Sequence, residues 1–396
     1  MPPRFCDCSL IIPTRNRCDI LSQTLSRILS ISDRNFEIIV CDNGSSDRTL
    51  EMASRFPRVR WIALEQNFGC AARNIGAVAA RGELLLMLDD DSWPLDGVIT
   101  RLVQRFREQL DLGAAVLRVR LASDLPRHDA GGSPGVIFNC GGAVRRSAFV
   151  ETGGYPIDYE YYVEEYDLCA RLWRAGWRIR RQGDLEVHHA RTTQNRNNNR
   201  MIHLLVRNNI RLWSRYAPPS MREDLIESTI ERYQRVAARE RALEGFSSGL
   251  RVAREWLSAP RRTRAPLNLS QFESLMGLDV AREEIAHWAD KHRAKRIGIW
   301  SRGKSAELLV DLLKNSGFSI VAVYDEVDRP DLWRGCALRN YSDFKPTDVD
   351  GLIIGSLSCG VAEDIRDTVL RERLAVPVLA PVTYGPTPRR QAAVSA

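Results

Sequence analysis

Three consecutive carboxylates follow the apolar run at 84–88, in the stretch LLLMLDDDSWP. The run has the composition of a buried parallel strand. Adjacent acids raise one another's pKa unless a cation lies among them. Carboxylate oxygens suit Mn²⁺ or Mg²⁺, so Asp89, Asp90 and Asp91 favour a divalent-metal site that also receives phosphates. The competing interpretation is a solvated acidic turn that begins a helix.

Four strand-like segments alternate with turn-rich loops and helical segments near the N-terminus. They are SLIIP at 9–13, FEIIVCD at 36–42, RVRWIAL at 58–64 and LLLML at 84–88. This alternation predicts a mostly parallel α/β sheet, whose ligands bind at the carboxyl ends of the strands.

Polar side chains fall at those strand ends. Asp42, Asp47 and Asn67 each follow a predicted strand, as the acid cluster does. Asp42 is placed to accept hydrogen bonds from a base or a ribose, and Arg73 is placed to meet a phosphate. Asp and Asn also fill turns for backbone reasons alone, so one such loop would mean little. Four together indicate a nucleotide site.

Five segments resemble, in order and spacing, the motifs of the family 2 glycosyltransferases. They are SLIIPTRNR, IIVCDNGSSDRT, NFGCAARNIGAVAARGELLLMLDDD, GGYPIDYEYYVEEYDLCARLWRAGWRI and RNNIRLWSRY. The match covers about residues 8–215 and is closest in character to bacterial rhamnosyltransferase-like enzymes that build cell-surface polysaccharides.

The resemblance implies a GT-A fold, an inverting mechanism and a nucleotide-sugar donor. It implies that Asp42 contacts the nucleoside, that Asn67 and Arg73 hold the nucleotide, and that Asp91 is the usual metal ligand. The implied donor-binding residues are Pro13, Thr14, Arg15, Asp42, Asn67, Arg73, Asp89 and Asp90. The implied metal ligands are Asp89, Asp91 and a histidine of the LEVHHART segment at 185–192.

Neighbouring residues of a strand point to opposite faces, so only one of His188 and His189 can serve as that ligand. The spacing favours His188, and we expect it at the metal. The competing interpretation is a pair of ordinary surface or core histidines.

A second pair of acids, Glu164 and Glu165, begins the helical pattern EEYDLCARLWRAGW. Acids in a first helical turn stabilise the helix dipole, which is the competing explanation. An inverting transfer needs a carboxylate that takes the proton of the acceptor hydroxyl. The family pattern Glu-Asp-x-Asp-Leu places that general base at Glu165, with Glu where Asp is usual. We expect Glu164 and Trp173 on the acceptor side, although Trp173 also fits a core-facing position.

The rest of the chain predicts two further parts. Residues 216–294 read as a helical, basic connector that packs on residues 1–215 or contacts a membrane surface. Residues 295–396 read as a small Rossmann-like α/β domain with strands RIGIW, SIVAVYDE, DGLIIGS and VPVLAPV.

The segment GIWSRGKS at 298–305 has the letters of a phosphate-binding P-loop. Gly298, however, lies inside the predicted strand, and no strand ending in Asp supplies a metal partner. Read as a dinucleotide motif, the segment has Trp300 where a glycine must allow a pyrophosphate to approach, although Asp325 lies where a ribose-binding acid would. We therefore expect no ordinary nucleotide site in this part.

Composition narrows the class of protein. The chain has 396 residues, 44% hydrophobic and 27% charged, as soluble globular proteins do, and a net charge of +7. The positive charge favours anionic small molecules or acidic lipids over nucleic acid. The N-terminus lacks a signal-peptide pattern, no apolar run reaches the ~20 residues of a membrane span, and the nine cysteines suit reduced thiols. These features predict a cytoplasmic enzyme, with peripheral membrane contact and a homo-oligomer as open expectations.

The sequence thus predicts an inverting, metal-dependent glycosyltransferase that acts on a saccharide or lipid-linked saccharide in cell-surface polysaccharide synthesis. The alternative is a nucleotide-sugar-binding scaffold that has lost catalysis and acts through residues 295–396. A phosphotransferase that uses Lys304 of the P-loop letters is a third, weaker hypothesis.

Overall fold

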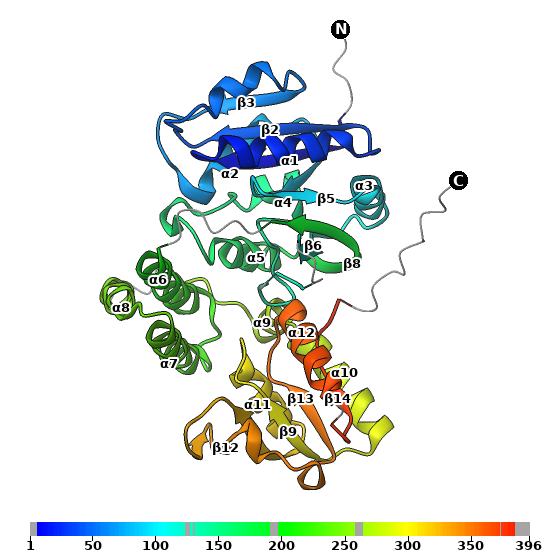
Figure 1. Ribbon diagram of the computed structural model, residues 1–396, viewed down its shortest axis with the longest axis vertical. Coiled ribbons are helices and arrows are strands. Elements are labelled where there is room, and N and C mark those ends of the chain that lie inside the picture. Colours follow the sequence, from blue (N-terminus) through cyan, green and yellow to red (C-terminus); the bar gives the residue numbers. More distant parts are fainter. Residues whose placement is uncertain are drawn as a thin grey trace.

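The computed structural model describes residues 6–122, 127–129, 131–190, 197–257, 264–372 and 374–384. Its first sheet has eight strands in the order β3-β2-β1-β4-β7-β6-β8-β5 (Figure 1). The strands are β1 Cys8–Thr14, β2 Phe36–Asp42, β3 Val59–Ala63, β4 Leu84–Met87, β5 Ser92–Pro94, β6 Leu112–Leu121, β7 Gly142–Arg145 and β8 Arg178–His189.

This sheet is mixed, as the sequence predicts. Parallel ladders join β3, β2, β1 and β4, and a further parallel ladder joins β6 to β8. Antiparallel ladders place β7 between β4 and β6, and pair β5 with β8. All seven residues of β1 are buried, which explains its unbroken apolar run. The four predicted N-terminal strands are confirmed.

Short helices connect and cover these strands. The α-helices are α1 Cys18–Ser30, α2 Ala72–Ala79, α3 Val98–Glu108, α4 Arg146–Glu151 and α5 Glu164–Arg174. The 3₁₀ helices are η1 Leu50–Ser54, η2 Gly69–Ala71 and η3 Ile157–Tyr159. Helix α5 begins with the two glutamates, so the predicted helix start is confirmed.

Helices dominate the middle of the chain. They are α6 Asn198–Tyr216, α7 Arg222–Arg239, α8 Leu243–Leu257, α9 Leu269–Met276 and α10 Leu278–His292. Helices α6, α7 and α8 lie together at one side of the molecule (Figure 1) and share a small hydrophobic cluster that includes Ile202, Ile210 and Phe246. Among the described residues, no helix combines the length and the apolar character that crossing a bilayer requires.

The second sheet has the order β11-β12-β10-β9-β13-β14 and lies at the opposite end of the molecule (Figure 1). Its strands are β9 Arg296–Trp300, β10 Ser319–Asp325, β11 Asp331–Trp333, β12 Cys336–Asn340, β13 Gly351–Ile354 and β14 Val378–Leu379. Its helices are α11 Ala306–Asn315, α12 Cys359–Arg371, η5 Tyr341–Asp343 and η6 Pro346–Asp348. All ladders except β11–β12 are parallel, which confirms the Rossmann-like prediction and adds the short hairpin β11–β12 to it.

The P-loop letters do not form a phosphate cradle. Gly298 lies inside β9, as expected. The N–H of Gly303 donates to the carbonyl of Gly355 at 2.8 Å, and a side chain at position 303 would meet that carbonyl and Ser356. The loop between β9 and α11 is therefore packed against the loop after β13, which leaves no backbone nest for phosphate.

Apolar packing joins the two sheets. One hydrophobic cluster includes Leu85 of β4, Leu168 of α5, Phe272 of α9, Ile285 of α10 and Ile299 of β9. The boundaries predicted at 215 and 294 stay predictions, because this core continues across them.

Buried polar contacts strengthen the junction. Arg118 of β6 pairs with Glu363 of α12 at 3.3 Å, and both side chains are almost fully buried. His128 contacts Glu363 and Asp364, each at 3.0 Å. The hydroxyl of Ser358 donates to the carbonyl of Gly131 at 2.9 Å. These groups hold α12 against the loop that follows β6.

Candidate active site

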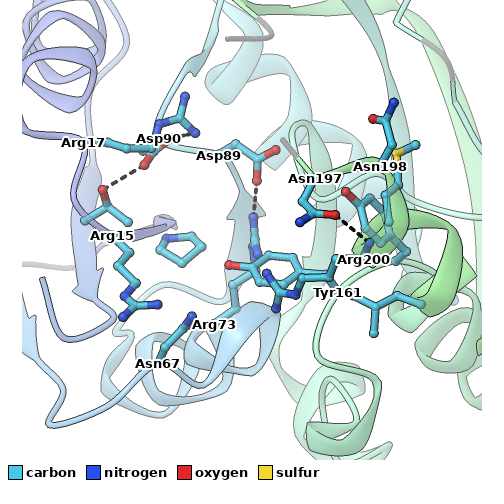
Figure 2. Close-up of a pocket in the computed structure, with 15 residues that line it drawn as sticks. Arg15, Arg17, Asn67, Arg73, Asp89, Asp90, Tyr161, Asn197, Asn198 and Arg200 are labelled. Atoms are coloured by element: carbon cyan, nitrogen blue, oxygen red, sulfur yellow. Dashed lines mark hydrogen bonds and ion pairs between the residues drawn. The ribbon is translucent and has the colours of Figure 1, made fainter. Parts of the chain in front are cut away.

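A cavity of about 390 Å³ opens at the carboxyl ends of β1 and β4 (Figure 2). It is lined by Pro13, Thr14, Arg15, Arg17, Asn67, Arg73, Asp89, Asp90, Tyr161, Tyr162, Asn197, Asn198, Arg200, Met201 and Leu204. We call it the donor cavity. Every residue predicted to bind the donor lies on its wall except Asp42.

Asp42 lies at the end of β2 but is fully buried. Its carboxylate accepts hydrogen bonds from the backbone and the hydroxyl of Ser45. The side chain thus braces its own loop, and its contact with a nucleoside stays a prediction.

Each acid of the 89–91 cluster has a cationic partner. Arg17 pairs with Asp90 at 2.9 Å and with Asp91 at 3.0 Å. The buried guanidinium of Arg73, on α2, pairs with Asp89 and also donates to the carbonyl of Leu88 at 3.2 Å. The cluster is therefore compensated in charge, as adjacent buried acids require.

The middle acid, Asp90, is almost fully buried. Burial raises the pKa of Asp90 to about 7, although Arg17 and the Thr14 hydroxyl oppose that rise. Thr14 donates to Asp90 at 2.8 Å from the end of β1. Asp90 thus links the end of β1 to the loop that follows β4. Its neighbours Asp89 and Asp91 lie near a histidine instead.

That histidine is His189, and the prediction of His188 as the metal ligand is wrong. Nε2 of His189 lies 3.0 Å from Asp91 and 4.0 Å from Asp89. His188 points to the other face of β8, where its Nε2 contacts Glu186 at 3.0 Å and its ring packs edge-on against Trp93. Alternation along the strand separates the two rings.

The residues present fit a divalent ion. Ligand atoms of Asp89, Asp91 and His189 all lie within 4.8 Å of one another. Two carboxylates and an imidazole are a donor set that suits Mn²⁺. Nδ1 of His189 contacts Asp129 at 2.7 Å, and such an outer contact fixes the ring of a ligating histidine. Burial disfavours the imidazolium, but Asp129 and Asp91 raise the pKa of His189 well above its ordinary value, so ion binding would release a proton.

A second cavity, of about 330 Å³, adjoins the first. We call it the acceptor-side cavity. The two share Arg73, Asp89, Tyr161 and Tyr162 on their walls. The other residues on the wall of the second cavity are Val119, Asp129, Gly131, Gly132, Phe138, Asn139, Cys140, Val163, Glu164, Glu165, Tyr166, His189, Leu205, Asn209, Tyr233 and Lys304. Asp89 and His189 therefore line the same cavity as the glutamate pair.

The glutamate pair is short of partners. Glu164 accepts a hydrogen bond from the amide of Asn139 at 2.7 Å, but one buried oxygen on each of Glu164 and Glu165 has no partner among the described residues. Burial and the charge of Glu165 raise the pKa of Glu164. Burial also raises the pKa of Glu165, although Lys304 and Arg73 oppose that rise. Such a pair favours a shared proton.

An irregular loop presents this pair, and the sequence analysis missed the residue that holds it. Glu160, Tyr162 and Val163 all have positive φ, and Val163 is the N-cap of α5. The buried amide of Asn208 donates to three carbonyls of residues 159–162, at 2.8 to 3.0 Å. The segment RNNIRLW contains Asn208 and was the signal that could have found it.

Trp173 does not lie on the acceptor side, which corrects the prediction. It is on the last turn of α5 and lines a different cavity, together with Gly135, Arg181 and Glu284. Its ring nitrogen donates to the carbonyl of Gly135 at 3.3 Å. Two helical turns separate Trp173 from Glu165, so the core-facing alternative fits better.

Comparison with known proteins agrees with this geometry. The model of glycosyl transferase family 2 matches residues 9–134, which hold the donor-side strands and the acid cluster. This match lies in the N-terminal part of the chain and covers about a third of it. The glycosyltransferase GlyG of Streptococcus pneumoniae is 32% identical over 106 residues, which are 26% of this chain and 35% of that protein.

Other relatives support the same family. The Escherichia coli protein UDP-Glc:alpha-D-GlcNAc-diphosphoundecaprenol beta-1,3-glucosyltransferase WfaP is 34% identical over 89 residues, 22% of this chain and 36% of that protein. The chain thus spans about a third of the length of these curated relatives. The solved structure of GalNAc-T7 with UDP, GalNAc and Mn²⁺ matches with a TM-score of 0.50 and 15% identity, over 72% of this chain and 58% of that one. The glycosyltransferase domain has the GT-A fold.

Proposed function

We propose that the protein is an inverting, metal-dependent glycosyltransferase that moves a sugar from a nucleotide-sugar donor to a saccharide or lipid-linked saccharide acceptor. One observation carries the proposal: Asp89, His189 and Glu165 line two adjoining cavities that share Arg73 and Asp89 on their walls. The lipid-linked alternative is supported by the similarity to the E. coli relative, whose name gives a diphosphoundecaprenol-linked sugar as its acceptor. Peripheral membrane contact, self-association and the rhamnose-like sugar stay predictions.

The donor cavity supplies the binding groups for the nucleoside diphosphate. Arg15 and Asn67 line it beside Arg73. Guanidinium groups bind phosphate with two hydrogen bonds at once, which suits a diphosphate. Asp89, Asp91 and His189 would hold the ion, which stabilises the negative charge that grows on the departing diphosphate.

Glu165 is the proposed general base. It takes the proton of the acceptor hydroxyl while that oxygen forms a bond to the anomeric carbon. The bond from that carbon to the phosphate oxygen breaks, and its electron pair leaves with the nucleoside diphosphate. Attack from the face opposite the leaving group inverts the configuration. The unpartnered oxygen of Glu165 is the atom available to receive the proton.

The first test combines donor binding with slow donor hydrolysis. Nucleoside diphosphates and their sugars are screened by thermal shift with and without Mn²⁺, on the wild type, Asp91→Asn and Glu165→Gln. We expect a Mn²⁺-dependent stabilisation that Asp91→Asn loses, since a ligand at ~100 times its Kd adds ~2.7 kcal/mol. Glu165→Gln should keep this binding and lose transfer and hydrolysis.

Asp111→Asn is the matched control, because this exposed acid pairs only weakly with Arg178 at the surface. Stabilisation without turnover in the wild type would favour the scaffold alternative. Full turnover in both site variants would remove the proposal.

A further inference from the structure

The second sheet contributes a cation to the active site. Lys304 lies in the loop between β9 and α11, yet its side chain lines the acceptor-side cavity together with Glu164, Glu165 and Asp89. Its ammonium lies 4.6 Å from the centre of the Tyr166 ring. The P-loop letters therefore place a lysine in the cavity of the glycosyltransferase domain.

The loop that carries Lys304 is held in place on both sides. The carbonyl of Lys304 accepts from the N–H of Leu357 at 3.0 Å, and Ser301 and Ser305, at the two ends of the loop, have positive φ. On the facing helix, the Tyr166 hydroxyl accepts from the backbone of Ser133 at 2.7 Å, which fixes the ring. Lys304 thus enters the cavity from a rigid support.

The ammonium of Lys304 has no carboxylate within 4.0 Å among the described residues. Burial opposes its charge, but Tyr166 and Tyr233 raise the pKa of Lys304, so the side chain is cationic at neutral pH. Beside it, Glu165 keeps a buried oxygen without a partner. A partly buried ammonium is more stable when an opposite charge meets it. The space beside the Lys304 ammonium is therefore suited to the anionic group of a ligand.

We propose that Lys304 binds an anionic group, a phosphate or a carboxylate, on the acceptor saccharide. The inference rests on the proposed function, which makes this cavity the acceptor side. The cavity volume of about 330 Å³ falls within the roughly 300–1,000 Å³ of small-ligand sites, so it has room for a sugar unit with its charged substituent. An acceptor held between Lys304 and Glu165 would present its hydroxyl to the base and its anion to the ammonium.

The test measures affinity for three soluble probes: a hexose 1-phosphate, a hexuronic acid and the uncharged hexose. The full-length protein is first saturated with a nucleoside diphosphate and Mn²⁺, so that the donor cavity cannot bind the probes. We expect the wild type to bind one or both charged probes roughly 10- to 100-fold more tightly than the hexose, as a hydrogen bond between charged groups provides. The charged probe that binds more tightly shows whether the site prefers a phosphate or a carboxylate.

Variants locate the effect at one side chain. Lys304→Met should lose the preference for charge, and Lys304→Arg should keep most of it. Lys295→Met is the matched control, since Lys295 is an exposed lysine directly before β9 and should leave the preference unchanged. Circular dichroism checks that each variant is folded. If Lys304→Met does not fold, Lys304→Gln is measured in its place.

Three outcomes overturn the inference: equal affinity for charged and uncharged probes, no binding of either charged probe, or a preference that survives in Lys304→Met. The two proposals fail separately. A wild type that prefers charged probes but never hydrolyses a donor contradicts the proposed function alone. A wild type whose donor hydrolysis is lost in Glu165→Gln, but which binds charged and uncharged probes equally, contradicts the role of Lys304 alone.

Discussion

Asp89–Asp91 and Glu164–Glu165 are both runs of adjacent acids beside two adjoining cavities, but their surroundings are opposite. Each aspartate has a cation at hydrogen-bond or ion-pair distance: Arg73, Arg17 or His189. Neither glutamate has a lysine, arginine or histidine nitrogen within 4.0 Å among the described residues.

The difference separates two tasks that a carboxylate can perform. Cations compensate the charge of the aspartates, which suits acids that hold a metal ion and orient phosphates. Burial without a cation raises the pKa of the glutamates, which suits an acid that must accept a proton and later release it. A substitution in one acid run, or in the residues around it, should therefore affect one of these two tasks more than the other.

The largest effect is expected at Glu165. Glu165→Gln removes the proton acceptor but keeps the size of the side chain, so transfer should fall by about 10²- to 10⁴-fold. Glu164→Gln should lose far less, because the amide can still meet Asn139. Initial rates of transfer, with circular dichroism as the check of folding, decide between the two. A larger loss of transfer rate in Glu164→Gln than in Glu165→Gln would make Glu164 the general base.

Removal of Arg17 should disturb the aspartates most. Arg17→Met leaves Asp90 and Asp91 without their guanidinium partner in a buried position, so the free energy of unfolding should fall by about 3 kcal/mol. Mn²⁺ should restore part of this loss, since it supplies positive charge to the same acids. Urea denaturation with and without Mn²⁺ measures both effects.

Arg178→Met is the control for that loss, since the exposed pair of Arg178 and Asp111 should contribute less than about 1 kcal/mol. An Arg17→Met protein as stable as the wild type would show that the acid cluster needs no fixed cation.

The position of the glutamates should depend on the loop before α5, whereas the position of the aspartates depends on their cationic partners. Asn208→Asp keeps the shape of the side chain but loses the amide donors that hold three carbonyls before α5, at a cost of about 2 kcal/mol. Amide exchange in residues 160–163 should become faster, and transfer should slow. Asn315→Ala, at an exposed helix end, is the control. Unchanged exchange in Asn208→Asp would count against this role.

The smallest effect concerns pH. The folded state raises the pKa of Glu164 and Glu165 above the 4.5 of an ordinary glutamate, so the unfolded chain releases these protons first. Stability from this source is present at low pH and is lost as the pH rises above that value. Glu164→Gln should therefore gain stability relative to the wild type as the pH rises from about 5 to about 8. A constant difference between the two proteins across this range would show that the pair does not share a proton.

The strands and the donor side could be predicted because their signals are local. Apolar runs that end in acids or amides mark parallel strands, and the carboxyl ends of such strands meet at one edge. This reasoning placed Asn67, Arg73 and Asp89 together, as the donor cavity has them.

The errors arise where the direction of a side chain depends on distant packing. His188 and His189 differ only in the face of β8 to which they point, and the pairing of β8 with β5 and β6 decides that face. Lys304 is a stronger case. Its own loop resembles a phosphate motif, and only the contact of that loop with α5 shows that the lysine serves another cavity.

The apolar core that runs from β4 through α5, α9 and α10 into β9 limits how this protein can vary. Two sheets that share one core cannot be exchanged as separate modules, because a recombined chain would expose the facing sides of α9 and α10 to water. Substitutions in the core beneath the second sheet should therefore also disturb the packing of the first sheet.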